Sequence, residues 1–156
     1  MKIVKLLLIL LILLDLTGCN HYVINKEEDN RIIISSININ SKYEMKSKNS
    51  EIKGIAMFKE CGRPDIDNTN VVIGAHSGTG KYALFNNIYK LKTDDEIIIY
   101  YNNKKYVYVV SVIKEVKDTE INIIEDKNKS ILTLLTCKIN DNSKRMVVIS
   151  DLKDNI

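Results

Sequence analysis

The chain has 156 residues, enough for one domain that buries its own hydrophobic core. Its 23 basic and 20 acidic side chains are mixed along the sequence and leave a net charge of +3, so no concentrated basic stripe indicates a nucleic-acid partner. Three cysteines are too few for a disulfide framework, although the sequence leaves open a single bridge between Cys61 and Cys137. The composition therefore favours one domain that needs no covalent staples.

The N-terminus has the order of residues that is typical of an export signal. Lysines precede an unbroken apolar run, residues 6–14, which is short for a full membrane span. The next residues, LTGC at 16–19, resemble the bacterial lipobox, which implies that Cys19 is lipidated; the alternative is an uncleaved signal anchor. Both interpretations predict that residues 1–19 tether the protein to the extracytoplasmic face of the plasma membrane. Residues 20–30 are polar without periodicity and predict a flexible tether.

The rest of the chain, residues 31–156, alternates short apolar runs with polar loops and predicts one mostly β domain. The helical spacing of apolar residues in 82–91 predicts a short helix. Adjacent Asn102 and Asn103 tolerate positive φ and predict a tight hairpin. The expected strands are residues 31–39, 43–45, 54–58, 70–75, 96–101, 105–113, 130–136 and 145–152. We therefore expect a mostly antiparallel barrel or sandwich of seven or eight strands with one or two short helices.

Three chemically useful side chains stand at the ends of predicted strands. Cys137 follows the run 130–136, His76 follows the run 70–75, and Arg145 opens the last strand. A thiol nucleophile needs a base that takes its proton, and a permanently protonated guanidinium can stabilise an oxyanion. Spacing alone is weak evidence, because a cysteine on an apolar strand is more often a small core residue.

The residues around these three side chains resemble the sortases, cysteine transpeptidases of Gram-positive cell surfaces. TLLTC at residues 133–137 matches the TLxTC signature of that family. NVVIGAH at residues 70–76 is close to the family's histidine strand, with Gly-Ala in place of the commoner Ala-Gly. Phe85, Leu91 and residues 95–97 resemble the family's F…L…GDxI segment. The resemblance implies a sortase-like β-barrel over about residues 31–152.

Carried over to this sequence, the resemblance implies a transpeptidase. Cys137 would be the nucleophile, His76 the general acid and base, and Arg145 the group that holds the substrate or the oxyanion. Thr136 would help to line the oxyanion site, or it is an ordinary strand residue. The substrate would be an LPxTG-type sorting signal near the C-terminus of a surface protein, and an amine of the cell wall or of a pilin would accept it. The alternatives are a cysteine peptidase that hydrolyses the same signal and a non-catalytic surface lipoprotein that binds peptides.

The same resemblance favours a compact class A-like or D-like member. The chain has no Asp-Pro-aromatic lid before the first strand, as the pilin-polymerising class has, and residues 114–129 are too few for the long helix of another class. Glu120, Glu125 and Asp126 resemble the calcium site of some class A members, but their spacing fits poorly, so we expect no cofactor and a solvated acidic loop. This loop is expected to contribute to substrate choice. Cys61 lacks neighbouring metal ligands and is expected to be a partly buried bystander.

Overall fold

A computed structural model of the protein describes residues 29–126 and 128–156. The predicted export signal, Cys19 and nearly all of the predicted tether lie outside the described residues. In the part of the chain that is described, no helix is long and apolar enough to cross a membrane.

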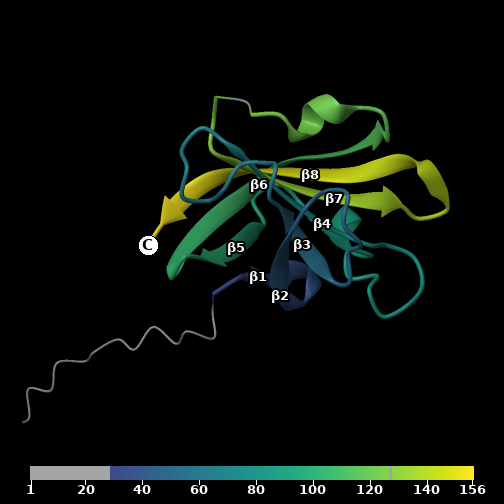
Figure 1. Ribbon diagram of the computed structural model, residues 1–156, viewed down its shortest axis with the longest axis horizontal. Coiled ribbons are helices and arrows are strands. Elements are labelled where there is room, and N and C mark those ends of the chain that lie inside the picture. Colours follow the sequence, from purple (N-terminus) through teal and green to yellow (C-terminus); the bar gives the residue numbers. More distant parts are fainter. Residues whose placement is uncertain (1–28, 127) are drawn as a thin grey trace, which may run out of the picture.

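The described residues form eight strands that close into one barrel, in the spatial order β1-β2-β3-β4-β7-β8-β6-β5 (Figure 1). The pairs β2–β3 and β4–β7 are parallel, and the other neighbours are antiparallel. The predicted mostly β barrel is therefore confirmed. The strands are β1 (Arg31–Ile34), β2 (Ile39–Lys46), β3 (Ile55–Phe58), β4 (Asn70–Ala75), β5 (Glu96–Tyr101), β6 (Lys104–Lys117), β7 (Ile131–Lys138) and β8 (Asp141–Asn155). Three short 3-10 helices connect them: η1 (Ser35–Ile37), η2 (Ile88–Lys90) and η3 (Ile121–Ile124).

Two hydrophobic clusters lie on opposite faces of the barrel wall. Alternate side chains of each strand point inward and fill the barrel, which gives the larger cluster; Leu132, Leu134 and Val148 belong to it. The smaller cluster lies on the outer face, where Ile123 packs near Val147. There the β6–β7 segment folds over the sheet (Figure 1). Apolar side chains thus cover both faces of the wall at β7 and β8, and this burial makes that part of the wall a rigid support.

The first predicted strand, residues 31–39, is in fact two strands. Helix η1 interrupts it, and Asn38 has a φ of 57°, so the chain reverses and Ile34 pairs with Ile39. Ile37 turns into the core while Ser35 and Ser36 stay exposed. Residues 31–39, an apolar run interrupted by two serines, therefore form a hairpin. Asparagine at position 38 tolerates the left-handed conformation that the reversal of the chain requires.

The predicted helix at residues 82–91 contains only the short helix η2, and the rest of it is turn structure. Its helical spacing still marks the buried side chains, since Phe85, Ile88 and Leu91 all enter the core. The Asn86 amide explains the irregular backbone: its oxygen accepts from the Gly78 amide at 2.7 Å, and its nitrogen donates to the Gly78 carbonyl at 2.9 Å. These bonds compete with the regular backbone ladder of a helix.

The last two long strands extend further than predicted. Strand β6 continues to Lys117 because its charged end pairs with β8 as far as Lys144. Strand β8 begins at Asp141, which pairs with Lys138 of β7. Arg145 consequently lies inside β8 and does not open it. The hairpin between β5 and β6 is confirmed, with φ of 51° at Asn102 and 59° at Asn103.

Candidate active site

Cys137 lies near the end of β7, where the strand leaves the covered part of the sheet. Its thiol is half-buried and free, as is that of Cys61, so these cysteines form no disulfide. Leu134 points into the barrel, whereas Leu135 packs on the outer cluster. By this alternation Cys137 belongs to the outer face. The Ser77 hydroxyl donates a hydrogen bond to the Cys137 carbonyl oxygen, which anchors the backbone that carries the thiol.

His76 follows the last residue of β4, the parallel neighbour of β7. Gly74 pairs with Leu135, and continuing this register by two residues brings His76 beside Cys137. The ring is exposed, and its Nε2 lies 3.0 Å from the Ile52 carbonyl oxygen. Because a carbonyl only accepts hydrogen bonds, Nε2 must carry the hydrogen, and in neutral imidazole the lone pair is then on Nδ1. The β2–β3 loop, which contains Ile52, thus determines which nitrogen of His76 is basic.

Thr136 ties the two strands together directly before the nucleophile candidate. Its buried hydroxyl donates to the Ala75 carbonyl oxygen at 2.7 Å, so its one hydroxyl hydrogen is used between the ends of β7 and β4. This contact fixes the relative position of the residues that follow each strand, His76 and Cys137. The hydroxyl therefore has a clear positioning role in this structure.

Arg145 is the direct antiparallel partner of Cys137, and the two residues share a face of the sheet. Its guanidinium is held by other groups. Nη1 donates to the carbonyl oxygens of Asn142 at 2.7 Å and Lys144 at 3.1 Å, and Nη2 lies 4.0 Å from an Asp118 carboxylate oxygen. The backbone thus places Arg145 beside Cys137, while the head group binds backbone carbonyl groups in the first residues of β8.

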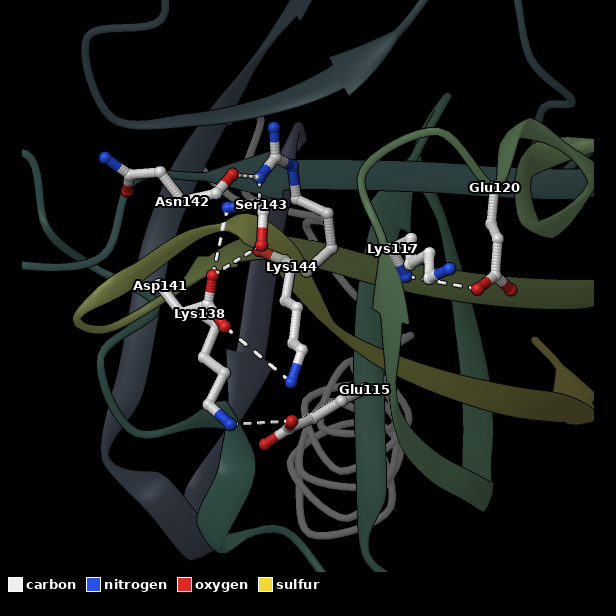
Figure 2. A network of polar contacts seen from close by, with 9 residues as sticks. Glu115, Lys117, Glu120, Lys138, Asp141, Asn142, Ser143 and Lys144 are labelled. Carbon is white, nitrogen blue, oxygen red and sulfur yellow. Dashed lines mark hydrogen bonds and ion pairs between the residues drawn. The ribbon is translucent and has the colours of Figure 1, made fainter.

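A cavity of about 330 Å³ opens beside Cys137 at the mouth of the barrel. Its walls come from the β4–β5 segment, the β7–β8 turn and the adjoining strands. Neither His76 nor Arg145 lines it. The lining residues include Phe85, Ile88, Tyr89, Ile139 and Met146, together with an ion pair between Glu115 and Lys138. Figure 2 shows these two charged side chains pointing toward one another from β6 and β7.

Sequence reasoning missed three contributors to this site. Ser77 directly follows His76, and its position beside a candidate base was a usable signal. Ile52 acts through its carbonyl group, which every residue has, so no sequence signal marks it. Glu115 falls in residues 114–129, which the sequence predicts to be a loop, whereas its place in β6 brings it to the cavity beside Cys137.

Two acidic residues of the β6–β7 segment, Glu120 and Asp126, bind backbone amides through their carboxylates. A Glu120 carboxylate oxygen accepts from the Lys117 amide at 3.1 Å, and an Asp126 oxygen accepts from the Asn70 amide at 2.7 Å. Among residues 29–126 and 128–156, no group of three His, Cys, Asp or Glu side chains is arranged to hold a metal ion. Asp126 therefore helps to attach this segment to the start of β4.

Cys61 lies apart from the catalytic candidates, in a second cavity between the β3–β4 loop and the β6–β7 segment. Its side chain is half-buried, and this burial raises the pKa of the thiol above its ordinary value. A raised pKa lowers the fraction of thiolate at neutral pH, so the environment of Cys61 suppresses its reactivity.

Comparison with known proteins identifies the family. A model of the sortase domain matches residues 32–153. The chain belongs to the sortase family. Sortase A of Bacillus anthracis is 39% identical to this sortase over 84 residues, which are 53% of this chain and 40% of that protein.

Solved structures agree in fold with this sortase. Sortase C1 of Streptococcus agalactiae superposes with a TM-score of 0.73 at 26% identity, over 81% of this chain and 68% of that one. Clostridium perfringens sortase C with the C-terminal cell wall sorting motif superposes with a TM-score of 0.68 at 31% identity, over 80% of this chain and 69% of that one. The similarity to solved sortases thus covers most of the described barrel.

Proposed function

We propose that this sortase is a cysteine transpeptidase that cleaves an LPxTG-type sorting signal and transfers the protein to an amine of the cell wall or of a pilin. The observation that carries the proposal is the parallel β4–β7 pair, which directs His76 and Cys137 to neighbouring positions. The hydrogen bond from Thr136 to Ala75 supports this register at the ends of both strands. The sorting motif in the Clostridium perfringens sortase C structure supports the substrate class.

The proposed first half-reaction forms a thioester. Cys137 Sγ attacks the threonine carbonyl carbon of the signal, and its proton passes to Nδ1 of His76. The C–N bond then breaks, and His76 returns that proton to the leaving amine. Arg145 would stabilise the oxyanion or hold the substrate once its guanidinium leaves the carbonyl groups of Asn142 and Lys144.

The second half-reaction resolves the thioester. The nitrogen of a neutral acceptor amine bonds to the thioester carbonyl carbon while the C–S bond breaks. One amine proton passes through His76 to Sγ, which restores the thiol, and the new amide keeps the other proton. Water in place of the amine would give hydrolysis, so the balance of the two products distinguishes a transpeptidase from a peptidase.

The cellular setting belongs to the same proposal. The export signal predicted at residues 1–19 supports a location at the extracytoplasmic face of the plasma membrane, where a lipidated Cys19 or an uncleaved anchor would hold the protein. The likeness to a sortase A supports a compact class A-like or D-like enzyme. The partners would be surface proteins that carry the sorting signal.

Replacement of the nucleophile tests the proposal. With an LPxTG peptide and an added amine, the wild-type protein should form the amide product, and Cys137→Ala should lower its rate by roughly 10³-fold or more. Cys61→Ala is the matched control, because it removes the other described thiol and should leave the rate unchanged within about twofold. Mass spectrometry of the products measures both rates.

The same assay separates the alternatives. Cleavage that continues in Cys137→Ala would reject the assignment of the nucleophile. A wild-type protein that makes only the hydrolysed peptide, even with added amine, would be a peptidase. Binding of the peptide without cleavage would identify a non-catalytic peptide-binding protein.

A further inference from the structure

The strand β7 presents Cys137 to two different environments. On the outer face of the sheet it stands across from Arg145 and beside the end of β4. At the barrel mouth it lines the cavity of about 330 Å³, together with Phe85 and Ile88 of the interior core. A thiol at this junction can meet one reactant on the outer face and another in the cavity.

The cavity combines apolar walls with a single pair of charges. Tyr89 and Ile139 line it and are among the exposed large hydrophobic residues of the described chain. Of the residues that line it, only Glu115 and Lys138 carry charge. Such walls suit an aliphatic chain, and a carboxylate beside them suits an ammonium group at the end of that chain.

The Glu115 carboxylate already forms an ion pair with an ammonium group of the protein itself. Lys138 Nζ lies 2.7 Å from Glu115 Oε2, and Lys138 is the residue that follows Cys137 (Figure 2). The two side chains are 34% and 39% exposed, so water competes for both and their attraction is weak enough for another cation to replace Lys138. Lys138 thus has the same head group and the same kind of stem as a lysine-like acceptor.

We propose that this cavity is the acceptor subsite, and that Glu115 binds the ammonium of an incoming primary alkylamine in place of Lys138. This inference rests on the proposed transpeptidase function and adds a class of acceptor, an amine on a lysine-like aliphatic stem. The docked ammonium loses one proton to solvent, and the neutral amine then attacks the thioester on Cys137. Its nitrogen bonds to the carbonyl carbon, the C–S bond breaks, and a second proton passes through His76 to Sγ.

Substitution of each member of the ion pair tests the subsite, because the two variants should change the KM for the amine in opposite directions. With saturating LPxTG peptide and Nα-acetyl-lysine amide as acceptor, Glu115→Gln should raise the KM for the amine about tenfold. Lys138→Gln should lower the same KM about threefold, because it removes the internal competitor. The measurement is the initial rate of amide formation against amine concentration, and thermal melting of each variant checks its fold.

The matched control breaks a similar ion pair elsewhere on the barrel. Glu96 and Lys153 join β5 to β8 at 2.8 Å, and neither residue lines the cavity. Glu96→Gln should therefore leave the KM for the amine unchanged. Equal effects of Glu96→Gln and Glu115→Gln would overturn the inference, because a general loss of surface charge would then explain both.

The remaining outcomes separate the subsite from the proposed function. An unchanged KM for the amine in Glu115→Gln, with wild-type transpeptidation intact, would overturn the subsite alone. If Glu115→Gln instead raised the KM for the sorting peptide, the cavity would bind the sorting signal, and the acceptor subsite would also be overturned. Absence of peptide cleavage by the wild-type protein would overturn the proposed function and the subsite together.

Discussion

The proposed catalytic role of His76 depends on which of its ring nitrogens holds the hydrogen. The Ile52 carbonyl lies 3.0 Å from Nε2 and can only accept. The β2–β3 loop therefore assigns the hydrogen to Nε2, and in the proposed mechanism Nδ1 takes the thiol proton. The Ile52 carbonyl, which precedes β4 by many residues, thus determines which ring nitrogen of His76 can act as the proposed base.

This tautomer can be observed directly. In protein labelled with ¹⁵N and held at a pH where His76 is neutral, the Nε2–H form should exceed the Nδ1–H form about fivefold, because one net hydrogen bond contributes about 1 kcal/mol. Two-dimensional ¹H–¹⁵N spectra of the imidazole nitrogens report the ratio, and His76→Gln distinguishes these signals from those of His21. A majority of the Nδ1–H form would contradict the assigned role of Ile52.

At the scale of elements, the end of β4 explains why glycine precedes alanine here. Ala75 points into the barrel and belongs to its core. Gly74 faces outward beneath the Phe58 ring, and a Cβ atom added there would lie 2.9 Å from Phe58 Cζ. The opposite order would push a methyl group against that ring and leave a gap inside, so the departure from the commoner motif follows from the β3–β4 packing.

Gly74→Ala should therefore lower the free energy of unfolding by about 1–3 kcal/mol through overpacking against Phe58. Urea denaturation measures the change. The Phe58→Leu variant supplies the control, since a smaller side chain gives the new methyl group room. The double variant should lose less stability than the sum of the two single changes, and a strictly additive result would show that Phe58 is not the obstacle.

For the whole molecule, closure of the barrel depends on the last strand. Strand β8 lies between β6 and β7 and pairs with both, so it joins the long hairpin strand to the strand of Cys137 (Figure 1). Arg145, Cys137 and Glu115 come from these three neighbouring strands. The candidate site therefore exists only when β8 has closed the sheet.

Removal of residues 147–156 should abolish the cooperative unfolding transition. It deletes the buried Val147 and Val148 and most of the backbone partners of β6 and β7. The stabilising free energy lost with these contacts should exceed the total of about 5–15 kcal/mol that keeps a typical domain folded. Thermal unfolding followed by near-ultraviolet circular dichroism measures this loss. Removal of residues 154–156 alone, all exposed, should keep the transition. A truncated chain that still melted cooperatively would show that the barrel closes without β8.

The sequence by itself determined the features that depend on local pattern and on short motifs. Alternating and continuous apolar runs located β4, β5 and much of β6, β7 and β8, and adjacent asparagines located the hairpin at Asn102 and Asn103. The residues around His76 and Cys137 carried the resemblance to the sortases, which the family match confirms. These signals are local because backbone preferences and side-chain alternation act over a few residues.

Only the tertiary structure decided how distant groups meet. It broke the first apolar run at Asn38 and extended β6 through a charged segment, where pairing with β8 outweighed the polar pattern. It also directed the Ile52 carbonyl to His76 and the Arg145 guanidinium to the Asn142 carbonyl at the start of β8. These contacts arise from packing and closure of the whole barrel, and a backbone carbonyl carries no residue-specific signal that a sequence pattern could reveal.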